Sequence, residues 1–452
     1  MIVNAENRIP VSQAFAKGTP RHTETVSMER ALMISLAISA ILMGASASVL
    51  FDAEREGSEA ALGETPPIHI SGHADLMKIG DDAGYPLNGN YLLTGDIDLT
   101  GIDFEPIGSK DARFTGTFDG NGFAIRNMDA CVEDDGDTNI SAGLFGYTDG
   151  AEIRNLGVAD SRISAAFMTV ETGGGSRAVA GGIVGDAKDT LIRNCYNASP
   201  VTAGHPSSAY AGGIVGYAEG STIEGCYNTG SITAAGAISY AGGVLGCDGD
   251  PTAGSTVRDC YNIGSVSVSG STEYAGGMAG RVIGSVENCY NVGPVIVSGS
   301  TGYAGGIAGS AMRILHCYSL TGKVSGDRIY GTGTPVLDSV DVTGDQSSGA
   351  KTRYQMKPTL TNAANGDSVY HTGTGGWDFD TIWIIDEGKN NGYPMLRVLA
   401  YSVTAWTETS DPDPFPEGYP DEDGNMLLYA GMAAAIAAIC VILYFFVFRK
   451  QS

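Results

Sequence analysis

Two short phrases alternate through the middle of the chain, and this repetition limits its possible folds more than any other feature. The first phrase reads Ala-Gly-Gly, then two apolar residues, then Gly, and in its complete form a Tyr precedes it. Complete copies begin at Tyr210, Tyr240, Tyr274 and Tyr303, and shorter copies begin at Ala142 and Ala180. The second phrase follows each copy and ends in Cys-Tyr-Asn or a close variant. The middle of the chain is therefore an array of similar units.

The second phrase sets the length of each unit. Its five cysteines are separated by 31, 34, 29 and 28 residues and are Cys195, Cys226, Cys260, Cys289 and Cys317. Between the phrases lie short β-branched runs broken by Gly and Asn, without helical periodicity. A unit of about 30 residues of this kind cannot bury its own apolar side, so successive units must stack on one another. We therefore predict an all-β, right-handed parallel β-helix with equivalent strands about 4.8 Å apart. A β-propeller is the alternative, although its units are longer, at about 40 residues or more.

Composition supports ordered β-structure and excludes some partners. The chain has 65 Gly in 452 residues, about twice the usual share, and is 43% hydrophobic. Collagen and disordered linkers do not combine these properties. The 26 basic and 51 acidic residues give a formal charge of −25. Such a surface repels phosphate backbones, so we predict no nucleic-acid partner.

The repeated cysteine position is predicted to face the interior. The first unit has Leu156 at this position, and a position that accepts either Leu or Cys is apolar. Cysteines stacked about 4.8 Å apart would have parallel side chains, which is poor geometry for disulfide bonds. A core ladder of free thiols is the preferred interpretation for Cys195, Cys226, Cys260, Cys289 and Cys317. Disulfide bonds are the alternative, because the chain is predicted to be secreted.

A tyrosine directly follows each of these cysteines, and strand alternation predicts that it faces outward. The first unit has Gly157 instead. An exposed aromatic ladder could bind sugar rings or a partner protein. The alternative is that the rings only stack on one another and stabilise the wall. The candidate binding residues are Tyr196, Tyr227, Tyr261, Tyr290 and Tyr318.

Both ends of the chain indicate export and membrane attachment. Residues 28–47 combine a charged start, a short apolar run and Ala45-Ser46-Ala47, as in a secretory signal, although an amino-terminal anchor is an alternative. Residues 426–448 form a run without charge that is long enough to cross a bilayer as a helix. Arg449 and Lys450 follow it, so the tail is predicted to be cytoplasmic and the rest extracellular. The predicted location is a cell membrane, with a single span.

The repeats resemble the GLUG-motif family, whose units pair a Gly-apolar-apolar-Gly phrase with a phrase like Asn-Cys-Tyr-Asn. Residues 143–322 match this pattern, and the flanks at 91–122 and 377–396 resemble the opening coils and closing segment that accompany it on prokaryotic surface proteins. Similar regions occur in adhesins and in the non-catalytic part of immunoglobulin-A-cleaving metallopeptidases. The resemblance thus implies a surface β-helix, and it names no substrate.

These features divide the chain into eight parts: an upstream segment and signal (1–47), a linker (48–67), amino-terminal capping coils (68–140), the repeat β-helix (141–325), carboxyl-terminal capping coils (326–400), an acidic Pro-rich stalk (401–425), the membrane helix (426–448) and a cytoplasmic tail (449–452).

No pattern in the chain predicts catalysis, a metal site or a cofactor. His69 and His73 are four residues apart but lack the Glu of a zinc peptidase motif. The acidic turns near residues 96, 134 and 248 do not follow calcium-loop spacing, so solvated turns are expected. We predict a non-catalytic adhesion or recognition protein, whose partner is a glycan or a surface protein of another cell. The alternatives are a glycan-active β-helix enzyme and a structural spacer.

Overall fold

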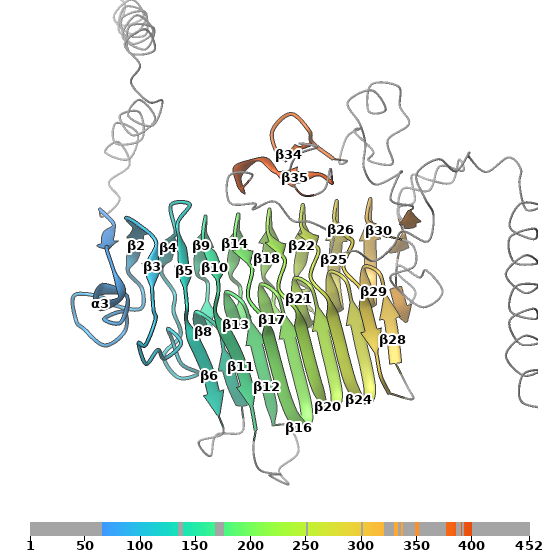
Figure 1. Ribbon diagram of the computed structural model, residues 1–452, viewed down its shortest axis with the longest axis horizontal. Coiled ribbons are helices and arrows are strands. Elements are labelled where there is room, and N and C mark those ends of the chain that lie inside the picture. The colour runs from blue at the N-terminus through green and yellow to red at the C-terminus, as the bar shows by residue number, and fades with distance from the viewer. Residues whose placement is uncertain are drawn as a thin grey trace, which may run out of the picture.

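The computed structural model describes a parallel β-solenoid of about seven turns with almost no helix (Figure 1). The described residues are 66–133, 139–167, 176–249, 252–299, 302–320, 330–332, 336–337, 349–351, 377–385, 390 and 393–399. The predicted signal, stalk, membrane helix and tail lie outside them. Within the described part of the chain, no helix has the length and hydrophobicity that a bilayer span requires. The helical elements described are α3 (His73–Leu76) and the 3-10 helix η3 (Arg397–Leu399).

Three parallel sheets form the walls of the solenoid, and the coils from β4 to β29 contribute strands to all three. We name them sheets A, B and C.

Sheet A has 15 described strands. They are β1 (Ile68–Ile70), β2 (Asn90–Leu93), β4 (Thr117–Asp119), β8 (Phe145–Asp149), β9 (Glu152–Arg154), β13 (Val184–Lys188), β14 (Leu191–Arg193), β17 (Val215–Glu219), β18 (Thr222–Glu224), β21 (Leu245–Asp248), β22 (Thr256–Arg258), β25 (Ala279–Glu287), β29 (Ala308–Leu315), β31 (Tyr330–Thr332) and β32 (Val336–Leu337).

Sheets B and C have nine described strands each. Sheet B contains β3 (Ile97–Asp98), β5 (Ala124–Arg126), β10 (Gly157–Ala159), β15 (Tyr196–Asn197), β19 (Tyr227–Asn228), β23 (Tyr261–Asn262), β26 (Tyr290–Asn291), β30 (Tyr318–Leu320) and β33 (Gly349–Lys351). Sheet C contains β6 (Asp129–Glu133), β7 (Asn139–Ala142), β11 (Arg162–Ala166), β12 (Arg177–Gly181), β16 (Val201–Gly212), β20 (Ile232–Gly242), β24 (Val266–Gly276), β27 (Val295–Val297) and β28 (Gly302–Gly305). A separate antiparallel pair joins β34 (Trp383–Ile384) and β35 (Met395–Leu396).

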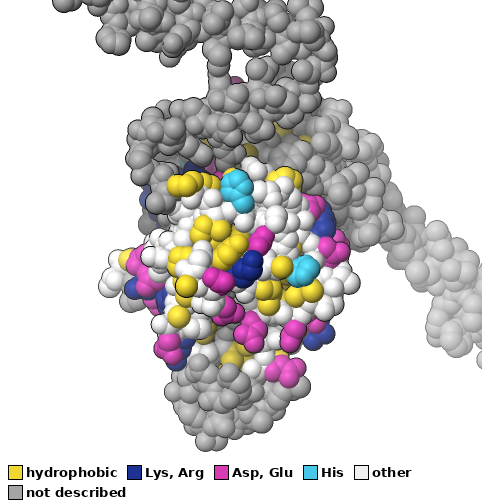
Figure 2. Space-filling model, turned by 90° about the vertical axis from the view of Figure 1, so that its left-hand side faces the viewer, with side chains coloured by type: hydrophobic (Ala, Val, Ile, Leu, Met, Phe, Trp, Pro, Cys, Tyr) yellow, Lys and Arg dark blue, Asp and Glu magenta, His cyan; other side chains and the backbone are white. Residues whose placement is uncertain are grey.

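Equivalent residues of successive coils pair in register. Tyr227 pairs with Tyr261 in sheet B, and Tyr240 pairs with Tyr274 in sheet C. The parallel solenoid predicted from the repeats is therefore confirmed, and the propeller alternative is wrong. The amino-terminal end carries α3 and mixed apolar and polar side chains, among which acidic groups outnumber basic ones (Figure 2).

An asparagine ladder inside the solenoid connects the coils. Its members Asn197, Asn228, Asn262 and Asn291 are fully buried. Each Nδ2 donates to the carbonyl two residues later at 2.8 Å. Each of the first three also donates to the Oδ1 of the next ladder asparagine, at 2.8–2.9 Å. The ladder therefore satisfies buried amides that would otherwise destabilise the core.

The asparagine ladder also explains the glycines of the first phrase. A Cβ added at Gly213 would lie 2.0 Å from the carbonyl oxygen of Gly243 and 2.5 Å from Cγ of Asn228. A Cβ added at Gly243 would likewise clash with Asn262, and one added at Gly277 would clash with Asn291. Only glycine permits the backbone of this corner to approach the ladder so closely. The two repeated phrases therefore contact each other within the same coil.

Candidate functional site

The structure places the cysteine and tyrosine positions on opposite sides of the wall, but it contradicts the prediction that the tyrosines are exposed. Tyr196, Tyr227, Tyr261, Tyr290 and Tyr318 face away from the main core, yet their exposed fractions are only 0–7%. We call them the buried tyrosine ladder. The first four rings stack at centroid distances of 4.8–5.2 Å, with planes within 5° of parallel. An open aromatic platform at this position is therefore wrong.

The closing segment, described at residues 377–385, 390 and 393–399, covers part of this ladder. Trp377, Trp383 and Tyr393 pack in one cluster with the buried rings. The hydroxyl of Tyr290 donates to the carbonyl of Pro394 at 2.6 Å, and the indole N–H of Trp377 donates to the carbonyl of His316 at 3.0 Å. Figure 1 shows β34 and β35 beside the strand ends near β26. The outward side of sheet B is thus an internal interface.

The five repeated cysteines lie in the main core as free thiols. Each is fully buried, and the Sγ of Cys226, for example, donates to the carbonyl of Glu224 at 3.2 Å. Burial raises the pKa of Cys226 and of Cys289 well above the usual value for a thiol. Cys226 and Cys289 are therefore neutral packing groups.

The other polar candidates do not converge on one site. His69 and His73 lie at the amino-terminal end, in β1 and at the start of α3. Burial raises the pKa of Cys131 to about 11. Among the described residues, no group of three or more His, Cys, Asp or Glu side chains is placed to hold a metal ion. The acidic turn at 134–138 lies outside those residues.

A second set of tyrosines, which we call the tyrosine row, is partly exposed. It consists of the tyrosines that open the complete copies of the first phrase: Tyr210, Tyr240, Tyr274 and Tyr303. They point out of sheet C, while their neighbours in sequence, such as Ala209 and Ala211, enter the core. Successive centroids are 4.9–5.2 Å apart. The sequence signal for this row is the Tyr that opens each complete first phrase.

A second outward row runs along sheet A beside the tyrosine row. It is formed by the residue that follows the last Gly of each first phrase: Tyr147, Asp186, Tyr217, Cys247, Arg281 and Ser310. The two rows touch where the rings of Tyr210 and Tyr217 stack at 5.7 Å. We call this the variable row, because six coils place five different residue types at one position. Its first four members are buried, and only Arg281 and Ser310 are partly exposed. The phrase around it is nearly constant, so this variation is not required by the backbone.

An arginine cluster lies near the amino-terminal end of these rows. Asp186 accepts a hydrogen bond from Arg113 at 2.9 Å and another from Arg177 at 2.8 Å. The guanidinium carbon of Arg177 also lies 3.9 Å from the ring centroid of Tyr217 and 5.9 Å from that of Tyr210. This cluster combines ion pairs with cation–π contacts, and it keeps one positive charge in excess. Burial raises the pKa values of Tyr217 and Tyr240 to about 12, so both phenols are neutral.

Arg281 is the exception among the described arginines. It has neither an ion pair within the described residues nor a hydrogen bond to an oxygen atom there, whereas the other described arginines have at least one of the two. Its strand neighbour in the variable row is Cys247, whose pKa burial raises to about 12. A half-buried guanidinium without a carboxylate partner is chemically suited to bind an external anion.

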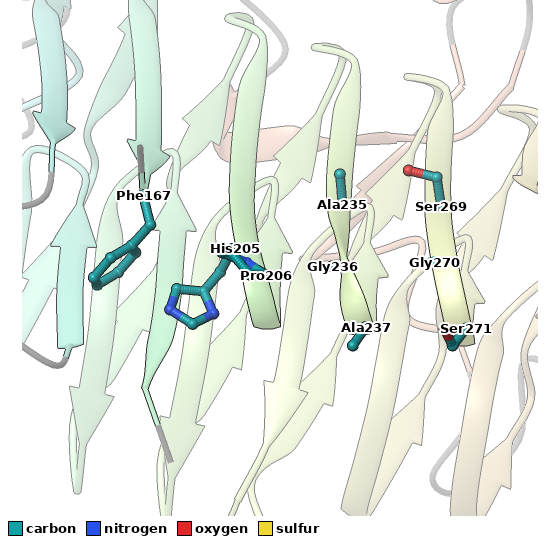
Figure 3. A pocket seen from close by; sticks show the side chains of 9 residues that line it. All are labelled: Phe167, His205, Pro206, Ala235, Gly236, Ala237, Ser269, Gly270 and Ser271. Atoms are coloured by element: carbon teal, nitrogen blue, oxygen red, sulfur yellow. The ribbon is translucent and has the colours of Figure 1, made fainter. Parts of the chain in front are cut away.

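A shallow depression of about 570 Å³ lies elsewhere on sheet C (Figure 3). The rings of Phe167 and His205 meet edge to face on one side, at 4.3 Å, and backbone around Gly236 and Gly270 forms the other side. Nδ1 of His205 accepts hydrogen bonds from the N–H groups of Ser207 and Ser208, at 2.7 and 3.0 Å. This ring therefore stabilises a local bend in β16, and we assign no chemistry to the depression.

The fold defines a repeat β-solenoid, and the tyrosine row with Arg281 and Ser310 is its partly exposed outward part. Residues 207–233, which include one complete first phrase and its Cys-Tyr-Asn, match the family model described as the GLUG motif. Residues 207–233 thus carry a GLUG motif, which agrees with the resemblance seen in the sequence.

Two comparisons extend this result. Over 152 residues, or 31% of this chain, the sequence is 30% identical to halomucin of Haloquadratum walsbyi, and the match spans 2% of halomucin. A crystal structure from Bacteroides ovatus, of a protein proposed to be an immunoglobulin A1 protease, has a TM-score of 0.50 and 19% identity to this chain. It covers 74% of this chain and 92% of that one. At this identity the likeness establishes a common fold and no common activity.

Proposed function

We propose that the chain is a non-catalytic recognition protein of a prokaryotic cell surface. In this proposal the right-handed solenoid forms the extracellular part, residues 426–448 anchor it in the membrane, and residues 401–425 hold it away from the bilayer. The apolar run before Arg449 supports this placement. The partner is a glycan or a protein on another surface.

One observation carries the proposal: a repeated, partly exposed tyrosine row lies beside Arg281 and Ser310, the partly exposed members of the variable row. Packing requirements hold most of each phrase constant, since its Gly, Ala and apolar residues enter the core or the asparagine corner. The tyrosines face outward and remain partly exposed, yet four of the six first phrases begin with one, whereas the other two have Ser141 and Val179 there. Tyrosine supplies rigid contact area at low entropic cost, and the partly exposed Arg281 and Ser310 of the variable row add chemistry that can distinguish partners.

The test is a binding screen of the purified full-length protein on glycan and surface-protein arrays. We expect binding that is strongly reduced by the double change Tyr240→Ala and Tyr274→Ala. The matched control is Thr202→Ala, which alters an exposed side chain of β16 outside both rows. Far-UV circular dichroism verifies that every variant remains folded.

Two outcomes would contradict the proposal. Cleavage of a bound glycan, measured as new reducing ends, would favour the enzyme alternative. No binding on either array would favour a structural spacer.

A further inference from the structure

The flat faces of the tyrosine row are closed to ligands. The rings of Tyr240 and Tyr274 stack at 4.9 Å with planes 5° apart, and Tyr303 covers the other face of Tyr274 at 5.0 Å. The edge of Tyr210 meets Tyr240 at 5.2 Å. A sugar ring therefore cannot stack on the middle tyrosines. What the row offers instead is ring edges and phenol hydroxyls.

The hydroxyls are available and regularly spaced. Those of Tyr240, Tyr274 and Tyr303 form no hydrogen bond to another described residue, whereas the hydroxyl of Tyr290 in the buried ladder has two partners. The rings repeat every 4.9–5.0 Å along this part of the row. A ligand that uses several of these hydroxyls must repeat with the same step.

Two kinds of extended polymer can be compared with this step. An extended peptide advances about 3.3 Å per residue, so neither one residue nor two residues span the distance between successive coils. A pyranose residue in a fully extended, equatorially linked chain advances by about one coil, and it presents hydroxyls at every step. The spacing therefore favours a polysaccharide aligned with the solenoid axis.

The charged side chains near the two rows limit the class of ligand further. The variable row and its direct contacts hold three guanidinium groups, on Arg113, Arg177 and Arg281, and two carboxylates, on Asp186 and Glu219. These groups sum to one positive charge, on a chain with a formal charge of −25. Arg281 is the cation that no described carboxylate neutralises, and it lies alongside the row. An anionic group on the ligand would complete this site.

We propose that the two rows bind an extended acidic polysaccharide of the β-1,4-linked uronate type. Sugar hydroxyls bond to the phenols of Tyr240, Tyr274 and Tyr303, and a sugar carboxylate pairs with Arg281. This inference rests on the proposed recognition function and names its ligand class.

Isothermal titration of the full-length protein with β-1,4-linked hexamannuronate tests the proposal. Mannohexaose is the matched neutral probe, because it has the same backbone without carboxylates. We expect hexamannuronate to bind at least tenfold more tightly than mannohexaose, with affinity falling as salt rises. Arg281→Gln should reduce this affinity about 10- to 100-fold and remove the preference for the acidic sugar.

The double change Tyr240→Phe and Tyr274→Phe removes two hydroxyls while it keeps both rings. We expect it to weaken binding about tenfold without a change in melting temperature. Tyr227→Phe, in the buried ladder, is the matched control and should leave affinity unchanged.

Three results would overturn the inference. Equal binding of both hexasaccharides would exclude an acidic ligand, and so would binding of neither. Sedimentation that shows a dimer broken by the same tyrosine changes, without sugar binding, would make the rows an interface between two copies. If the arrays detect a different partner that depends on Tyr240 and Tyr274, the recognition function stands and only its ligand class is wrong.

Discussion

Replacing Asn228 by Ala tests whether the asparagine ladder holds adjacent coils together. The Asn228 side chain takes part in four hydrogen bonds. Its Nδ2 donates to the carbonyl of Gly230 and to Oδ1 of Asn262, and its Oδ1 accepts from the N–H of Gly230 and from Nδ2 of Asn197. Alanine removes all four.

The loss of stability depends on which hydrogen-bond partners of Asn228 keep another hydrogen bond. Nδ2 of Asn197 retains the carbonyl of Ser199, and Oδ1 of Asn262 retains the N–H of Gly264. The N–H and carbonyl of Gly230 lose their side-chain partner inside the solenoid. Each buried polar group left unsatisfied costs about 1–3 kcal/mol, so we expect the free energy of unfolding to fall by roughly 2–6 kcal/mol.

Urea unfolding followed by far-UV circular dichroism measures this loss. Thr202→Ala, on an exposed position of β16, is the control and should cost less than about 0.5 kcal/mol. Solenoids can unfold in stages, so the comparison uses the earliest transition that the substitution shifts. A loss below about 1 kcal/mol for Asn228→Ala would show that water or backbone rearrangement replaces the ladder, and the reasoning would fail.

Three further changes test other parts of the structure. Tyr261→Ser should lower the free energy of unfolding by several kcal/mol, because this ring is almost fully buried; a change within 0.5 kcal/mol of wild type, a roughly surface-like effect, would contradict its burial. Burial raises the pKa of Asp259 to about 6, so the native state retains a proton that the unfolded chain releases, and stability falls as pH rises from about 4 to 6. Asp259→Asn should remove this loss, worth on the order of 1–3 kcal/mol, and an unchanged pH profile of urea unfolding would refute the assignment. Thiol titration in denaturant without reductant should detect all five ladder cysteines, and five blocked thiols would contradict the core of free cysteines.

The sequence was sufficient to predict the solenoid because its repeats encode local rules. Alternation along each strand correctly placed Cys226 toward the core and Tyr227 away from it. The unit length favoured a solenoid over a propeller, and the lack of helical periodicity argued against a helical repeat. These are properties of one coil and its immediate neighbours, and the same physical requirements recur in every unit.

Exposure of the tyrosines could not be predicted in this way. Tyr290 contacts Pro394 and Asn390, about 100 residues further along the chain. Nothing in the repeats indicates which wall the closing segment will cover, since an outward aromatic row looks the same in sequence whether it meets solvent or another segment. The tyrosines of the first phrase, such as Tyr240, follow the same alternation and remain partly exposed. The local pattern thus gave the direction of each side chain but not what lies above it.

The in-register pairing of equivalent residues has an evolutionary consequence. Duplication or loss of one whole unit, such as that between Cys226 and Cys260, would lengthen or shorten the protein by one layer while every remaining contact kept its geometry. Insertion of a partial unit would instead break the alignment of the Asn228 and Asn262 amides. Lineages carrying this architecture can therefore adjust reach and multivalency in single steps of about 4.8 Å, and they can change one outward residue per step without redesigning the interior.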